Sequence, residues 1–161
     1  MFYNIIGIDT KKWQWTECNV YVARTRKRTD GIMGDFVKYY KGNFCEAGNF
    51  GKETPIVLNA WHPRVAYLKK YKCYVMSSAP VNYGNQNQLI KDYMEIRTST
   101  DLIKWSDPII IEKDGKPIGN HYQAIISYLG KNNPYVVTND KFTLLHCHNG
   151  TNVKSINIII K

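Results

Sequence analysis

Short runs of β-branched and aromatic residues, separated by turn-forming residues, restrict the fold of this chain more than any other feature. The runs occupy residues 20–23, 65–68, 74–76, 94–96, 109–111, 125–126, 135–137, 142–145 and 156–160. Asp-Gly, Asn-Asp and Asn-Gly pairs lie between several of them, and such pairs are typical of tight turns. No segment of about 12 or more residues has helical periodicity. The pattern predicts an all-β fold, namely a sandwich, a barrel or a propeller.

Two internal similarities favour the propeller among these folds. Residues 93–109 and 20–37 share one order: a strand, a polar Arg-Thr segment, a turn with Asp, an aromatic residue and a second strand. Residues 62–76 and 121–137 each begin with histidine and lead through a strand and a polar turn to a Tyr-Val strand. We therefore predict a single all-β domain or fragment built of β-propeller blades of four antiparallel strands, spanning approximately 1–57, 58–114 and 115–161.

Composition excludes several classes of protein. The chain has 161 residues, of which 43% are hydrophobic and 13% aromatic, and this content predicts an ordered domain rather than a disordered chain. No run approaches the roughly 20 consecutive apolar residues of a membrane span, so no membrane partner is expected. The N-terminal residues lack the basic and apolar segments of a signal peptide. If Met1 is the true start, a cytoplasmic location is expected.

The cysteines and the basic residues do not form a recognised motif. Cys18, Cys45, Cys73 and Cys147 are widely spaced, which predicts free thiols and supports neither a zinc ribbon nor a thioredoxin site. The formal net charge is +9, with one tight basic cluster at residues 24–28. This cluster is either a solvated loop or an anion site for a polysaccharide or nucleic acid. No nucleic-acid-binding motif accompanies it, so no nucleic-acid partner is predicted.

Two motifs in the middle of the chain resemble the five-bladed β-propeller glycoside hydrolases of family 43 and their furanosidase relatives. The first is His62-Pro63-Arg64-Val65-x-Tyr67-Leu68-x-x-Tyr71-x-x-Tyr74-Val75-Met76. The second is Ile96-Arg97-Thr98-Ser99-Thr100-Asp101-Leu102-Ile103-Lys104-Trp105-Ser106-Asp107-Pro108. The second motif also resembles the Asp box of sialidases, so Asp101 and Trp105 are interpreted as blade-turn residues.

The resemblance covers about residues 20–160 and implies hydrolysis of a poly- or oligosaccharide. Carboxylates at the mouth of a central channel would supply the acid and the base. Only about three blades fit in this length, whereas the family has five. Missing blades or a homo-oligomer would therefore have to complete the ring.

The candidate catalytic residues are Glu46, His62 and Glu95. Glu46 lies in a Gly-rich stretch that we expect to form a functional loop. His62 stands where the relatives often have Asp, and this departure favours the alternative of a non-catalytic carbohydrate-binding fragment. Glu95 shares a strand face with Arg97, so this pair is either structural or holds a group of the sugar.

The candidate substrate-binding residues combine aromatic rings, on which sugars stack, with cations and polar groups. They are Trp61, Arg64, Tyr83, Arg97, His121 and Tyr122. Trp13 and Trp15 share a strand face and are interpreted as packing residues. In arabinan-cleaving relatives a channel histidine is associated with calcium, so the resemblance implies His121 as a metal residue and a calcium ion in the channel. No other cofactor is required.

The basic side chains suggest two further alternatives for the function. A sialidase-like enzyme would need an arginine cluster on the carboxylate of the substrate, for which Arg24, Arg64 and Arg97 are the candidates. The second alternative is a basic surface that binds an anionic polymer without catalysis.

Overall fold

The computed structural model describes residues 1–12, 14–26, 28–81, 93–118, 122–127, 135–148 and 152–160. Within these ranges all regular structure is β, and no helix is present that is long and apolar enough to cross a membrane. The strands are β1 (Phe2–Asp9), β2 (Gln14–Arg24), β3 (Val37–Tyr40), β4 (Asn43–Ala47), β5 (Ala60–Leu68), β6 (Cys73–Pro80), β7 (Glu95–Ser99), β8 (Ile109–Ile110), β9 (Glu112–Lys113), β10 (Lys116–Pro117), β11 (Ala124–Ser127), β12 (Val136–Val137), β13 (Lys141–His148) and β14 (Asn152–Ile159). The all-β prediction is confirmed.

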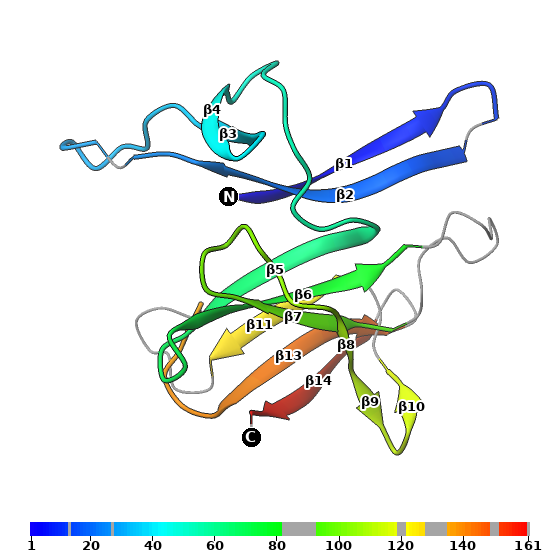
Figure 1. The fold of residues 1–161 in the computed structure, drawn as a ribbon. Coiled ribbons are helices and arrows are strands. Elements are labelled where there is room, and N and C mark those ends of the chain that lie inside the picture. Colours follow the sequence, from blue (N-terminus) through cyan, green and yellow to red (C-terminus); the bar gives the residue numbers. More distant parts are fainter. Residues whose placement is uncertain are drawn as a thin grey trace.

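Three sheets lie in stacked layers, as Figure 1 shows. The first has the order β1-β2-β3-β4, and the second contains β5-β6-β7-β8; in both, each strand pairs antiparallel with the next. The third has the order β11-β13-β14. A propeller blade is a four-stranded antiparallel sheet, and the first two layers have this strand order. The described sheets therefore form a propeller-like fragment, as predicted.

The third layer departs from the expected repeat. β11 pairs directly with β13, whereas β12 pairs in parallel with β5 of the second layer. The N–H of Tyr67 donates to the carbonyl of Tyr135, and that of Lys69 to the carbonyl of Val137, both at 2.8 Å. β12 thus satisfies backbone groups along an edge of β5 that would otherwise be open. Despite their similar sequence order, the described parts of residues 121–137 do not pair with each other as residues 62–76 do.

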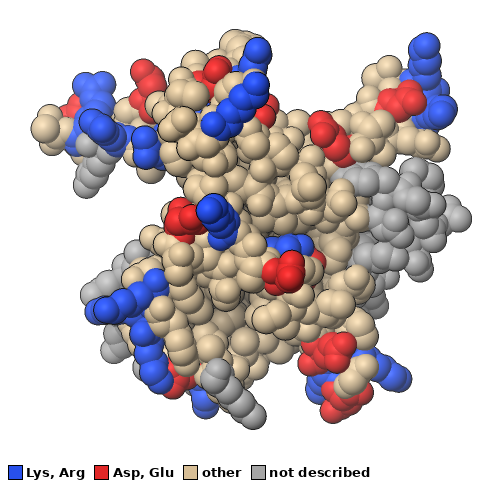
Figure 2. Space-filling view, viewed as in Figure 1, with Lys and Arg blue, Asp and Glu red and all other residues tan. Residues whose placement is uncertain are grey.

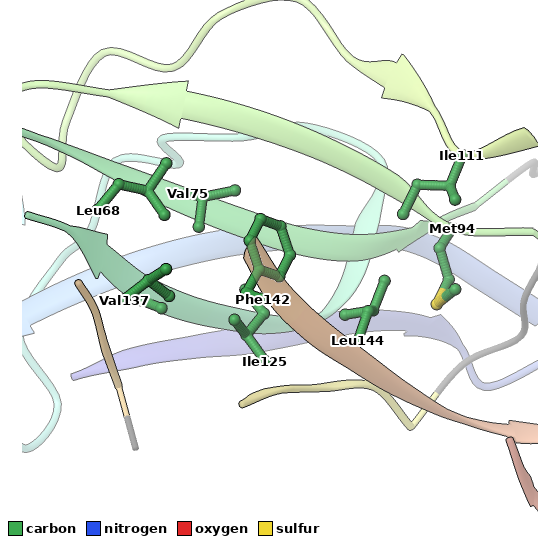
Figure 3. Packing of buried hydrophobic residues seen from close by; sticks show 9 residues of the cluster. Leu68, Val75, Met94, Ile111, Ile125, Val137, Phe142 and Leu144 are labelled. Carbon is green, nitrogen blue, oxygen red and sulfur yellow. The ribbon is translucent and has the colours of Figure 1, made fainter. Parts of the chain in front are cut away.

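Apolar side chains fill the spaces between the layers. Between the second and third layers, Phe142 and Leu144 of β13 pack with Val75 and Met94, and all four are fully buried. Figure 3 shows Phe142 directed from β13 toward Val75. A second cluster joins the first two layers through Val20, Val57, Ala60 and Met76. Burial of these side chains stabilises the stack.

The turn between β7 and β8 is built around Asp101. Its Oδ1 accepts hydrogen bonds from the N–H groups of Ile103 and Lys104, both at 2.8 Å. The indole N–H of Trp105 donates to the carbonyl of Leu102, and its ring packs edge-on against Phe2 at 6.1 Å between centroids. The interpretation of Asp101 and Trp105 as turn residues is confirmed.

We expect Asp101→Ala to lower the free energy of unfolding by about 1 kcal/mol at pH 7, because it removes the acceptor for two turn N–H groups. The N–H groups of Lys104 and Ile103 hold the pKa of Asp101 below its ordinary value. A carboxylate with a lowered folded-state pKa stabilises the fold above its unfolded pKa of about 3.9, and this contribution is lost as the pH falls through the folded value. Urea unfolding should therefore show that the difference in the free energy of unfolding between the unchanged protein and Asp101→Ala shrinks below about pH 4.

The matched control is Asp107→Ala in the same turn, whose exposed carboxylate accepts no hydrogen bond within the described residues. It should change stability by less than about 0.5 kcal/mol. A difference for Asp101→Ala that stays constant from neutral to acid pH would contradict the role of its charge.

Candidate functional site

Four aromatic side chains from all three layers meet at one end of the molecule. Trp61 of β5 stacks on His62 with centroids 3.9 Å apart and meets Trp15 of β2 edge-on at 5.1 Å. Tyr122, two residues before β11, lies 4.6 Å from the His62 ring and 6.3 Å from the Trp61 ring. Tyr122 is 57% exposed and the other three are half-buried. We call Trp15, Trp61, His62 and Tyr122 the aromatic cluster.

An irregularity in β5 places His62 in this cluster. The register with β6 shifts between Trp61 and Arg64, and Pro63, which has no N–H to donate to a ladder, lies within this bulge. His62 has a φ of 53° and Tyr122 a φ of 64°, values that bulky residues rarely adopt. Such backbone strain is found preferentially at functional sites. Two of the four cluster residues carry it.

Three asparagines hold this part of β5 against the first layer. The amide of Asn4 donates to the carbonyls of Asn19 and Ala60, both at 2.9 Å, and its Oδ1 accepts the N–H of His62 at 2.9 Å. The Oδ1 of Asn19 accepts the N–H of Asn59 at 3.1 Å. We call Asn4, Asn19 and Asn59 the asparagine network. It fixes the backbone of His62 relative to β1 and β2.

A buried thiol adds to the same contact. The Cys18 thiol lies 3.6 Å from the carbonyl of Ala60, to which it donates. Burial, and secondarily the nearby Glu17 carboxylate, raises the pKa of Cys18 to about 12, so the thiol is neutral at physiological pH. All four cysteines are free, as the sequence predicts.

Protein-family models, curated proteins and solved structures gave no match to this chain. The resemblance to family 43 therefore stays a prediction from the two sequence motifs.

Glu46 does not lie in a loop. Residues 43–47 form β4, in which Glu46 pairs with Lys38 of β3, so the loop prediction is wrong. The physical reason is the Lys41-Gly42 turn, in which both residues have positive φ, the backbone that a two-residue hairpin requires. The Glu46 carboxylate accepts the N–H of Lys52 at 3.2 Å.

The structure does not bring Glu46 together with the aromatic cluster. β3 joins β2 at Ala23, whereas Trp15 lies near the opposite end of β2. At roughly 3.3 Å per residue, the distance along β2 from Trp15 to Ala23 is about 26 Å. In Figure 1 the β1–β2 hairpin accordingly lies at the right, and β3 and β4 lie toward the left.

Glu95 and Arg97 form a pair within β7, as the sequence predicts. The Glu95 side chain is 5% exposed and that of Arg97 16%. Glu95 Oε1 accepts the Arg97 Nε–H and Nη2–H at 3.3 and 3.1 Å and the hydroxyl of Ser78 at 3.0 Å. Arg97 Nη1 donates to the carbonyl of Ser106 at 3.1 Å. These contacts tie β7 to β6 and to the following turn, which favours the structural alternative for the pair.

The other predicted cations are dispersed. The Arg64 guanidinium is exposed and donates to the carbonyl of Pro63 at 3.1 Å. Arg24 stacks on Phe44 in the first layer, and Arg97 is paired with Glu95. The three arginines that a sialidase-like site requires are not gathered. On the face drawn in Figure 2, Lys and Arg lie in separate groups, several of them on protruding segments, and Asp or Glu lies beside most of these groups.

Two predicted site residues, Tyr83 and His121, lie outside the described residues. Among the residues that are described, no group of three or more His, Cys, Asp and Glu side chains is placed to hold a metal ion. The calcium ion stays a prediction.

Trp15 is the cluster residue that sequence reasoning assigned to packing alone. It shares a strand with the buried segment of β2, and nothing in that strand indicates a contact with Trp61 of β5. The signal that was available is that two polar residues, Gln14 and Thr16, flank Trp15. Trp15 is therefore expected at the entry of a strand rather than in its buried centre.

Proposed function

We propose that this protein binds a carbohydrate through the aromatic cluster. The observation that carries the proposal is the meeting of four rings, with Tyr122 57% exposed: Trp15 comes from β2, Trp61 and His62 from β5, and Tyr122 from the segment before β11. Aromatic rings offer large flat apolar faces with little conformational freedom, and the apolar faces of sugar rings stack on such surfaces. The exposed guanidinium of Arg64, two residues from His62, is suited to bind sugar hydroxyls.

Binding is better supported than hydrolysis. Glycoside hydrolysis uses two carboxylates about 5–10 Å apart that flank the scissile bond. Of the two acids that the sequence put forward, Glu46 is about 26 Å away along the sheet at 3.3 Å per residue, and Glu95 is buried against Arg97 and Ser78. The non-catalytic alternative is therefore the one that we propose.

The proposal is tested by titrating the protein with a panel of neutral and acidic oligosaccharides and following tryptophan fluorescence. A sugar that stacks on the cluster should quench the emission saturably. Tyr122→Ala should weaken the affinity for that sugar about two- to tenfold, since a stacking contact of one aromatic ring contributes about 0.5–1.5 kcal/mol.

Phe50→Ala is the matched control, because Phe50 is a fully exposed ring in the first layer. It should leave the affinity unchanged. Equal losses in both variants, or affinity that depends only on salt and not on the sugar, would contradict the proposal. Release of reducing sugar from the same panel would show turnover and reject the non-catalytic assignment.

A further inference from the structure

A second candidate site lies between the first layer and the turn that joins β7 to β8, remote from the aromatic cluster. A cavity of about 530 Å³ opens where β2 ends, a volume typical of small-molecule sites. Its walls are mainly apolar and include Phe2, Val22, Met33, Phe36 and Leu102. It lies near Ala23 and Arg24, the end of β2 opposite to Trp15.

The guanidinium of Arg24 stands at this cavity, and it donates no hydrogen bond to any residue that the structure describes. The guanidinium carbon of Arg24 lies 4.3 Å from the centroid of the Phe44 ring, and this stacking orients the planar group. Within the described part of the chain, no carboxylate pairs with it: the ion pairs found involve Arg28, Lys38, Lys70 and Arg97. Arg24 therefore offers its donors to a ligand.

The acid that lines the cavity does not neutralise this cation. Asp101 is directed into its own turn, where Oδ1 accepts two backbone N–H groups and the hydroxyl of Ser99. A smaller cavity of about 310 Å³ shares Arg24 and Phe44 with the first, and its lining adds a second cation, Arg26, and an acid, Asp35. The cavity thus combines apolar walls with an arginine that is stacked on Phe44 and has no ion-pair partner among the described carboxylates.

We propose that this cavity binds a small amphiphilic carboxylate, with its apolar part against Phe2, Met33 and Phe36 and its carboxylate on the Arg24 guanidinium. The fork of an arginine matches a carboxylate with two parallel hydrogen bonds, and the apolar walls gain from excluding water. This site is independent of the proposed carbohydrate binding, because it lies about 26 Å along β2 from Trp15 at 3.3 Å per residue.

The probe for the test is 4-phenylbutanoate, titrated into the full chain labelled with ¹³C at the methionine methyl groups. Met33 lines the cavity, whereas Met94 is buried between the second and third layers. We expect a saturable shift of the Met33 signal and none of the Met94 signal. Arg24→Gln should weaken binding about tenfold, as expected for loss of a charge-assisted pair.

Two controls separate the charge from the apolar walls. The neutral analogue 4-phenylbutan-1-ol should bind about tenfold more weakly than the carboxylate. Arg28→Gln removes an equal charge whose partner is Asp30, and it should leave the affinity unchanged. The proposal is overturned if the alcohol binds as tightly as the carboxylate, or if Arg24→Gln binds the carboxylate as tightly as the unchanged protein does. The absence of a saturable shift of the Met33 signal also overturns it.

Discussion

Replacing Arg97 by methionine is expected to lower the free energy of unfolding by about 3–5 kcal/mol, the cost of leaving a buried charge without its partner. Glu95 is nearly inaccessible, and among the described residues Arg97 supplies two of the three hydrogen bonds to its Oε1. Methionine retains an unbranched apolar side chain, so the main change is the loss of charge. Urea unfolding at pH 7 measures the effect.

The double variant Glu95→Gln with Arg97→Met tests whether the unpaired charge is the cause. It removes both charges and should recover at least half of the loss, because a neutral amide is far less costly to bury than a carboxylate. Arg28→Met is the exposed counterpart, since the Arg28–Asp30 pair is 63% and 42% exposed. It should cost less than about 1 kcal/mol. If Arg97→Met lowers the stability as little as Arg28→Met does, the Glu95–Arg97 pair is not structural.

The alternating pattern of the strands was sufficient to predict the fold class and many of the strands. Runs such as residues 65–68 and 142–145 lie within β5 and β13, because side chains of period two on half-buried sheets leave a strong signal. The turn at Asp114-Gly115 was also predictable from the sequence. Both residues have positive φ, and Asp-Gly is the pair that such a hairpin turn favours.

Elements held by long-range contacts were not predictable from local pattern. β4 was interpreted as a loop because Gly48 and Gly51 follow it, although β3 pairs with it through the Lys41-Gly42 turn. The run of residues 135–137 predicted β12 as a strand, but not its parallel pairing with the edge of β5. Neither pairing leaves a periodic signal in the sequence.

The candidate site was predictable only in part, because local pattern locates strand entries but not contacts between sheets. Trp61, His62 and Tyr122 were chosen from their positions at strand entries, and the structure brings these three together. Trp15 joins them from another sheet. Glu46 was chosen by composition, and its separation from the others is set by which end of β2 receives β3.

The contact between the first two layers is expected to depend strongly on Asn4. Asn4→Ala should lower the free energy of unfolding by about 2–4 kcal/mol, because the carbonyls of Asn19 and Ala60 and the N–H of His62 lose their side-chain partner in a half-buried setting. It should also weaken sugar binding, since the positive-φ backbone of His62 is no longer held by Asn4.

Asn4→Asp separates the two roles of this side chain. A carboxylate still accepts the N–H of His62 but faces the carbonyls of Asn19 and Ala60 without a proton to donate, so stability should fall while sugar affinity is better retained than in Asn4→Ala. The control is Asn157→Ala on exposed β14, whose Oδ1 accepts the Thr143 hydroxyl at 3.0 Å. It should cost less than about 0.5 kcal/mol. If Asn4→Ala is as mild as this control, the asparagine network does not hold the layers together, and the position of His62 must be set by the bulge at Pro63 alone.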